Sequence, residues 1–312
     1  MTIRALTVLV SVPLLAGLCT SIEAAETVPW WKQQKLVFMW GQWNHARTDK
    51  SQNYWRADLP RRLFRDVASA GATVFVELRW YNPNNARLAH EFGLKYFATK
   101  FQSDVVSPEL PGRFYVDQSG QEPVTKAGYT YKCPLDEAVY EKWLVEPHLE
   151  GVRAGLIDGI HVDWEYYGGN GEARGVCYCQ DCFAAFLTQH KIRADLPEPT
   201  TRFAFLGKQN LVKTYADRFH QRRIDMFTRL RERLQAVKPD LIFSSYDIKP
   251  VARMPAILRA WNTPDVPLIW LDQRHYATDD RQPWWESYSE QLRKEGCLYI
   301  PGGWTQALFG MQ

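Results

Sequence analysis

Apolar runs rich in β-branched and aromatic residues recur along this chain, and segments with helical spacing separate them. This alternation is the pattern of βα units, in which helical crossovers connect parallel strands. Seven runs are predicted to be strands: 35–40, 72–78, 94–101, 157–164, 240–246, 267–272 and 297–301. The predicted fold class is therefore α/β, a (β/α)8 barrel of the TIM type. An eighth strand cannot be placed, so the barrel is incomplete at the C-terminus, is closed by a partner or a missing segment, or includes a strand that the pattern misses.

Helices are predicted between the strands, at 59–69, 135–154, 183–189, 208–237 and 284–295. In the fourth of these, apolar residues recur three, four or seven positions apart, which places them on one buried helical face. A longer connection, at about 102–134, is predicted to be an excursion with short strands at 113–117 and 129–132. In a barrel it would lie over the C-terminal ends of the strands, where functional loops belong.

The N-terminus has the pattern of a secretory signal peptide. Arg4 precedes an apolar run from Ala5 to Leu18, and small and polar residues follow as far as Ala25. The run is too short to span a membrane. We expect residues 1–25 to be a signal peptide and residues 26–312 to be a single barrel catalytic domain. The mature chain is then secreted or periplasmic and has no membrane span.

Composition excludes two broad classes of protein. The chain is 46% hydrophobic and 14% aromatic, whereas an intrinsically disordered chain would be poor in aromatic residues and strongly charged. The formal net charge is only +3 over 312 residues, and no basic block stands out. A nucleic-acid partner is therefore not predicted.

The most informative stretch runs from Leu156 to Tyr166, at the end of a predicted strand. Side chains alternate between the faces of a strand, so His161, Asp163 and Glu165 share one face. That face is predicted to line the barrel interior at the C-terminal ends of the strands, where barrel enzymes carry out their chemistry. Crowded carboxylates raise the pKa of one of them, which lets a glutamate act as a general acid. The alternative is a strand end whose carboxylates are solvated or paired with an arginine.

The segment Asp158-Gly-Ile-His-Val-Asp-Trp-Glu resembles the signature Asp-x-x-Asp-x-Asp-x-Glu of family 18 glycoside hydrolases, the chitinases and endo-N-acetylglucosaminidases. Asp158, Asp163 and Glu165 match the first, third and fourth acidic positions, and His161 replaces the second. The resemblance implies that Glu165 is the proton donor and that Asp163 orients a substrate acetamide, which acts as the nucleophile. The chain is also similar to uncharacterised exported glycosidase-like barrels in which a Cys-x-Cys-x-x-Cys element follows the acidic stretch.

Aromatic, acidic and amide residues follow nearly every predicted strand. Flat rings bind the apolar faces of sugars while carboxylates and amides bind the hydroxyls, so this arrangement is typical of a carbohydrate cleft. Trp304 also resembles the tryptophan that ends the last strand in family 18 enzymes. The alternative is that the aromatic residues belong to the core. The predicted substrate-binding residues are His161, Trp40, Glu77, Tyr246, Asp247, Gln273, Tyr276 and Trp304.

Three cysteines, Cys177, Cys179 and Cys182, lie within six residues, and Cys133 lies upstream. Three thiolates at this spacing can bind one tetrahedral Zn²⁺, with Cys133 as the fourth ligand. Disulfides are the competing interpretation, because an exported chain can form them. In either case a structural role beside Glu165 is predicted, and no cofactor is predicted for catalysis.

Together these patterns predict an exported glycoside hydrolase that acts on a poly- or oligosaccharide, with Glu165 as the general acid. In a two-carboxylate mechanism, Asp272 or Asp247 would be the nucleophile or base. Two further alternatives stay open. One is a barrel that binds carbohydrate without catalysis, and the other is a metal-dependent hydrolase with His161 and Asp163 as ligands.

Overall fold

The structure is a computed structural model that describes residues 28–41, 58–77, 81–101, 110–124, 128, 130–163, 176–246, 259–273 and 284–302. The chain divides into two compact units, Met1–Gln34 and Lys35–Gln312. The first unit contributes the short helix α1 (Trp30–Gln33). All other elements belong to the second unit.

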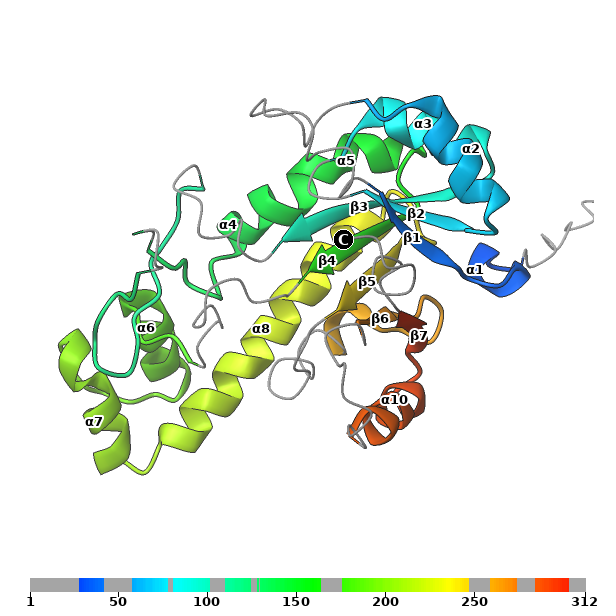
Figure 1. The fold of residues 1–312 in the computed structure, drawn as a ribbon. Helices are drawn as coiled ribbons and strands as arrows, with labels where there is room; N and C mark the ends of the chain where they lie inside the picture. The colour runs from blue at the N-terminus through cyan, green and yellow to red at the C-terminus, as the bar shows by residue number, and fades with distance from the viewer. Residues whose placement is uncertain are drawn as a thin grey trace, which may run out of the picture. The chain divides into compact units, whose positions relative to one another are not determined.

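The second unit is built on one parallel sheet. Its strands follow one another in chain order, each hydrogen-bonded to the next, and they form a curled half-barrel (Figure 1). This confirms the predicted α/β class and the seven predicted strands as an incomplete (β/α)8 barrel. The strands are β1 (Phe38–Gly41), β2 (Val74–Glu77), β3 (Lys95–Phe101), β4 (Gly159–Asp163), β5 (Ile242–Tyr246), β6 (Ile269–Gln273) and β7 (Leu298–Gly302).

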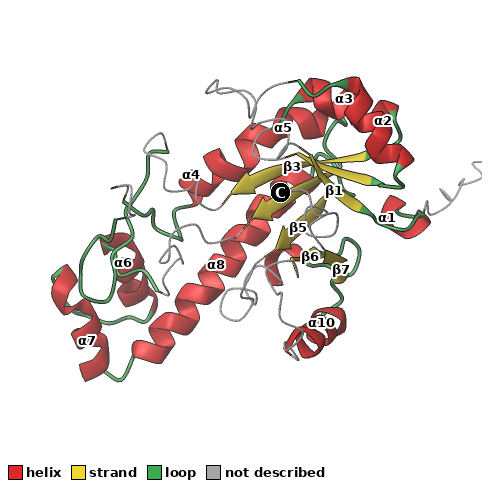
Figure 2. Cartoon of the chain, viewed as in Figure 1, coloured by secondary structure: helices red, strands yellow, loops and turns green. Residues whose placement is uncertain are grey.

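Helices connect the strands (Figure 2). Among the described residues, no helix is both long enough and apolar enough to cross a membrane. The helices are α2 (Arg61–Ser69), α3 (Pro83–Glu91), α4 (Glu137–Tyr140), α5 (Glu146–Arg153), α6 (Gln180–Gln189), α7 (Arg202–Lys208), α8 (Val212–Gln235) and α10 (Trp284–Lys294).

Helices α3 and α7 were not among the predicted elements. The sequence Asn82-Pro-Asn-Asn85 reads as a turn, yet it starts a helix, because the Asn82 side chain accepts hydrogen bonds from the backbone N–H groups of Asn84 and Asn85 at 2.9 and 3.2 Å. Pro83 then occupies the first helical position, where its missing N–H costs nothing.

The predicted helix 135–154 is interrupted by a π-helical turn, Glu141–Val145, between α4 and α5. Pro147 lies just after this turn, where it can donate no backbone hydrogen bond and would crowd the carbonyl of the preceding turn of an α-helix. The wider π turn relieves that conflict. The backbone carbonyl of Leu144 lies 2.6 Å from the ring nitrogen Nδ1 of His148.

The excursion between β3 and α4 differs from the prediction of two short strands. Its described residues pair only through isolated antiparallel bridges, Phe114 with Lys132 and Val124 with Thr130. Pro123 and Pro134 flank these bridges and lack the N–H that a continuous ladder would need. Backbone hydrogen bonds still join its two halves, from Tyr115 N–H to Tyr131 O and from Cys133 N–H to Arg113 O, each at 2.8 Å.

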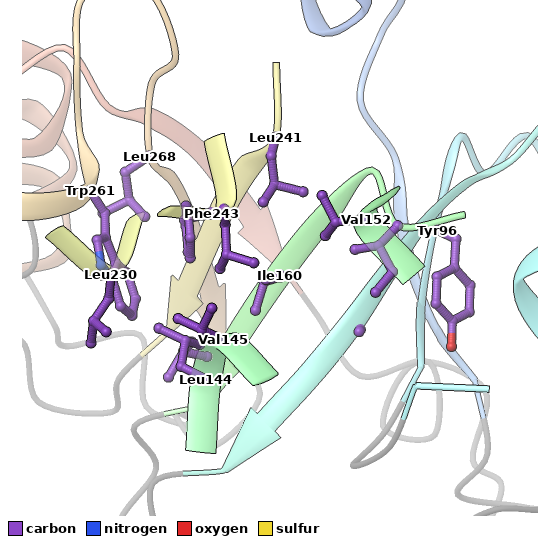
Figure 3. Packing of buried hydrophobic residues seen from close by; sticks show 14 of the residues in the cluster. Tyr96, Leu144, Val145, Val152, Ile160, Leu230, Leu241, Phe243, Trp261 and Leu268 are labelled. Atoms are coloured by element: carbon purple, nitrogen blue, oxygen red, sulfur yellow. The ribbon is translucent and has the colours of Figure 1, made fainter. Parts of the chain in front are cut away.

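One large apolar cluster packs between the helices and one face of the sheet. Ile160 and Val162 of β4 belong to it, together with Leu144 and Val145 of the π turn and Leu230 of α8 (Figure 3). The apolar half of β4 therefore faces the helices, as the alternation of its residues predicted. His161 and Asp163 occupy the alternate positions, on the face away from the helices.

A second apolar cluster surrounds the cysteines. It combines the excursion, α6, α7 and the first turns of α8, and Figure 1 shows α6 and α7 beside the start of α8, away from the strands. Tyr215 and Phe219 of α8 pack in this second cluster, whereas Met226 and Leu230 of the same helix pack in the first. With 24 residues, α8 is about 36 Å long, which lets it contribute to both.

We expect Gly159→Ala to destabilise the protein by about 1–3 kcal/mol, because it overpacks a filled interior. A Cβ at this position would overlap the Phe97 ring, which is fully buried and is packed edge-on against Phe38. The matched control is Gly207→Ala in α7, where a Cβ would have no neighbour within 4 Å. The control should leave stability unchanged or raise it by up to about 1 kcal/mol. Urea unfolding of both variants tests the pair, and equal effects would contradict the packing argument.

Candidate functional site

The acidic stretch is divided between the two ends of β4. Asp158 precedes the first residue of the strand, and Asp163 is its last residue. Every residue from Asp158 to Asp163 is buried. Strand β4 lies between β3 and β5. The residues around its two ends differ, so the two carboxylates have different roles.

Asp158 is surrounded by donors. Its Oδ2 lies 2.7 Å from Nε2 of His90 and accepts the backbone N–H of Tyr96 at 3.0 Å, and its Oδ1 pairs with Lys95 and Lys238, each at 3.2 Å. Burial raises the pKa of Asp158, but the His90 contact, the Lys238 charge, the Tyr96 N–H and the Lys95 charge together lower it to about 2. This first acidic residue of the motif therefore ties α3, β3 and the turn before β5 to the N-terminal end of β4.

At the other end of β4, polar groups line the face away from the helices. The sheet register pairs His161 with Thr99 of β3 and with Ser244 of β5. Nδ1 of His161 is hydrogen-bonded to Oγ of Ser244 at 2.8 Å. All three side chains have no exposed surface. One register row therefore carries three buried polar side chains across adjacent strands.

Burial lowers the pKa of His161 to about 3, so its imidazole is neutral at neutral pH. A neutral ring has one N–H donor and one acceptor nitrogen, and Ser244 engages the Nδ1 position. His161 can therefore orient its neighbours but holds no proton to give as an imidazolium. This fits a positioning role.

Asp163 lies two residues further along β4, in the next register row on the same face. It is 2% exposed and is paired with Phe101 of β3 and Tyr246 of β5, so an acid is flanked by two aromatic positions at the C-terminal edge of the sheet. The backbone of Trp40 lies near the end of β1, and the backbones of Asp272 and Gln273 end β6. These parallel strands all point the same way, so their C-terminal ends share one edge of the sheet.

Several predicted site residues lie outside the described residues: Glu165, Asp247, Tyr276 and Trp304. The side chains of Trp40, Tyr246, Asp272 and Gln273 also lie outside what the structure describes. Their predicted roles therefore stay predictions. The residues brought together are His161 and Asp163 on one face of β4.

Thr99 and Ser244 were not predicted as part of this site. The sequence does show hydroxyl residues among the apolar residues of two strands, at Tyr96-Phe-Ala-Thr-Lys-Phe and at Ile242-Phe-Ser-Ser-Tyr. Oγ1 of Thr99 has no hydrogen-bond partner among the described residues, although it is completely buried. Only the register of the sheet shows that both hydroxyls flank His161.

Glu77 does not share the face of His161 and Asp163. The register pairs it with Ala98, which packs in the cluster beneath the helices. Its carboxyl accepts hydrogen bonds from the Tyr96 hydroxyl and, at 2.6 Å, from the Asn85 amide. Burial raises the pKa of Glu77 to about 8, although these two hydrogen bonds oppose the shift. Among the described residues, Glu77 thus belongs to a network under α3, and its predicted contact with substrate stays a prediction.

The four predicted metal-binding cysteines lie close together in the structure: Cys133, Cys177, Cys179 and Cys182. Their sulfur atoms all lie within 4.8 Å of one another, and the side chains are buried. The Sγ atom of Cys133 lies 3.4 Å from that of Cys182 and 3.8 Å from that of Cys179. The sequence-based grouping of these cysteines is thus reproduced in space, with Cys133 contributed by the excursion and the others by α6 and the residues before it.

No protein-family model and no curated protein sequence matches the chain. Solved structures with a similar fold include a β-galactosidase from Bacillus circulans sp. alkalophilus, with 13% identity, a TM-score of 0.49, and coverage of 77% of this chain and 41% of that one. An α-galactosidase from Lactobacillus brevis has 11% identity and a TM-score of 0.45, over 86% of this chain and 33% of that one. The PgaB (BpsB) glycoside hydrolase domain from Bordetella bronchiseptica has 11% identity and a TM-score of 0.48, over 84% and 80%. The chain thus spans less than half the length of either galactosidase.

We expect Asp158→Asn to lower the free energy of unfolding at pH 7 by about 2 kcal/mol. This is the free energy that corresponds to lowering the pKa of Asp158 from 3.8 to about 2 on folding. Because the folded pKa is depressed, the ionised carboxylate stabilises the fold above pH 3.8, and this stabilisation is lost as the pH falls through about 2. Denaturant unfolding from pH 7 to pH 2 should show a smaller acid-induced loss in the variant. The control is Asp240→Asn, an exposed carboxylate 4.0 Å from the same Lys238. A variant as stable as this control would contradict the assignment.

We expect Glu77→Gln to remove a pH dependence of stability. The pKa of Glu77 is raised from 4.5 to about 8. The protonated side chain therefore contributes fully to the stability of the fold below pH 4.5, and this stability is lost as the pH rises through 8. Between these values the wild type should lose about 1.4 kcal/mol per pH unit relative to the variant. Unfolding of both proteins at closely spaced pH values measures this difference. Glu150→Gln, at an exposed position of α5, should keep the wild-type profile. Parallel profiles for wild type and Glu77→Gln would exclude a protonated Glu77.

Proposed function

We propose that this chain is an exported glycoside hydrolase that cleaves glycosidic bonds of a poly- or oligosaccharide, with Glu165 as the general acid. The observation that carries the proposal is the placement of Asp163. Its buried side chain lies at the C-terminal edge of the sheet, on the face away from the helices, two residues before Glu165. This is the edge where barrel enzymes carry out their chemistry.

The neighbours of Asp163 support a carbohydrate substrate. The register places an aromatic residue on each side of it, and the preceding row on the same face carries hydroxyl and imidazole groups. Sugars offer apolar ring faces and many hydroxyls, so alternating aromatic and polar positions suit them. The predicted residues Trp40 and Gln273 occupy strand ends on the same edge.

The chemistry that we propose divides two tasks between adjacent acids. Glu165 donates a proton to the oxygen of the leaving group as the glycosidic bond breaks. Asp163 contributes negative charge beside the anomeric carbon, where positive charge develops in the oxocarbenium-like transition state. The nucleophile is either an acetamide of the substrate, as the family 18 resemblance implies, or a second carboxylate, for which Asp272 and Asp247 are the candidates.

The neutral state of His161 fits this division of tasks. Because its pKa is about 3, His161 carries no positive charge at neutral pH and does not form an ion pair with Asp163. The hydrogen bond to Ser244 fixes the orientation of its ring. His161 is then a positioning residue beneath the acids.

We expect Glu165→Gln to lower the hydrolysis rate of natural glycosides by about 10²–10⁴-fold, because the amide keeps the shape of the side chain but cannot donate the proton. Aryl glycosides with very acidic leaving groups need less protonation and should lose much less. Rates on both substrate types, with circular dichroism and thermal unfolding to confirm folding, make the measurement. Glu290→Gln, an exposed residue of α10 paired with Lys294 at 2.9 Å, is the control.

Two outcomes would overturn the proposal. Wild-type rates for Glu165→Gln on an unactivated glycoside would remove Glu165 from the role of general acid. A wild-type protein that binds polysaccharide in affinity electrophoresis but cleaves nothing in a broad glycoside panel would instead be a carbohydrate-binding barrel.

A further inference from the structure

The four sulfur atoms of Cys133, Cys177, Cys179 and Cys182, hereafter the cysteine cluster, have the spacing of a tetrahedral metal site. A tetrahedron of thiolates with zinc–sulfur distances of about 2.3 Å has sulfur–sulfur separations of about 3.8 Å. In the cluster, Cys133 Sγ lies 3.4 Å from Cys182 Sγ and 3.8 Å from Cys179 Sγ, and all four sulfurs lie within 4.8 Å of one another. A disulfide would need about 2.05 Å. The cluster is therefore too open for disulfides and of the right size for an ion.

The local backbone supports thiolate ligands. Sγ of Cys177 accepts the N–H of Val116 at 3.5 Å and the N–H of Cys179 at 3.4 Å. Sγ of Cys133 accepts the N–H of Leu135 at 3.5 Å. Such N–H donors around the ligand atoms are the outer shell that orients and tunes a metal site. They come from the excursion and from the residues before α6, so the cluster joins two segments that are far apart in the sequence.

One positively charged residue, Arg113, lies beside the cluster. Four thiolates on one divalent cation carry a net charge of about −2. Arg113 lies beside Cys133, because its backbone carbonyl accepts the N–H of Cys133 at 2.8 Å. Its guanidinium is held in place by a hydrogen bond to the Leu135 carbonyl at 2.9 Å and by ion pairs with Asp181 at 2.9 Å and Asp136 at 3.4 Å.

We propose that the cysteine cluster binds one zinc ion through four thiolates and that this ion is structural. Four protein ligands fill a tetrahedral shell and leave no position for substrate or water. The cluster is buried within the second apolar cluster, and Cys182 lies in the first turn of α6. The ion therefore joins the excursion to α6, just beyond the segment that carries Glu165.

The first test is metal content. The full chain is expressed without a polyhistidine tag, purified, and analysed for zinc and for free thiols after denaturation. We expect about one zinc per chain and free thiols at all four positions. Replacement of zinc by Co²⁺ should give the charge-transfer absorption of cobalt bound to thiolates. Stepwise addition of an organomercurial to the wild type should release the metal, a readout that needs no variant.

Variants test which cysteines bind. Cys182→Ser should lose the zinc and lower the melting temperature, because one ligand of the closed shell is missing. Cys297→Ala is the matched control, since Cys297 is also a buried thiol but lies before β7 and outside the cluster. The control should keep about one zinc per chain.

Three results would overturn the inference. They are disulfide-linked peptides among the four cysteines, a wild type without stoichiometric metal, and equal zinc content in Cys182→Ser and Cys297→Ala. Each concerns the metal alone and leaves the proposed hydrolase activity open. Conversely, a protein that binds zinc but cleaves no glycoside would sustain the metal site and contradict the proposed function.

Discussion

Helix α8 couples the two apolar clusters of the second unit, and the other elements depend on this shared packing. Tyr215 and Phe219, near its start, pack around the cysteines, and Met226 and Leu230 pack against the sheet. A continuous helix is stiff over this length, since each turn is closed by backbone hydrogen bonds. The excursion, α6 and α7 are therefore fixed relative to the strands, although Figure 1 shows α6 and α7 lying away from them.

This coupling matters most for the segment that follows β4. The chain leaves the sheet at Asp163 and is described again from Val176, directly before Cys177. At one end, β4 is held by pairing with β3 and β5 and by the ion pairs of Asp158. At the other end, the cysteine cluster holds the start of α6. In the sequence, the proposed general acid Glu165 lies between these two segments. A structural ion in the cysteine cluster would therefore affect the reaction only by holding the start of α6.

The sequence predicted those features that follow from local periodicity. Parallel strands buried on both faces read as short apolar runs, which is why all seven were found, and the alternation in β4 placed Ile160 and Val162 against the helices. Features that depend on register could not be predicted. Ser244 lies 83 residues after His161, and only the pairing of β4 with β5 brings them together. Likewise Glu77 ends a strand as expected, but its register with Ala98 turns it to the helix side.

The residues that match the family 18 signature have different roles in this fold. Asp158, at the base of β4, has its charge balanced by Lys95 and Lys238 and also contacts His90, so it serves stability. At the top of β4, a second carboxylate beneath Asp163 would add like charge within a buried row, whereas a neutral His161 adds none. His161 also exchanges the acceptor-only chemistry of a carboxylate for one donor and one acceptor, and Ser244 engages one of them. Relative to the signature, His161 therefore removes a negative charge from this face of the strand, and Asp163 is the charged residue on that face in the described part of β4.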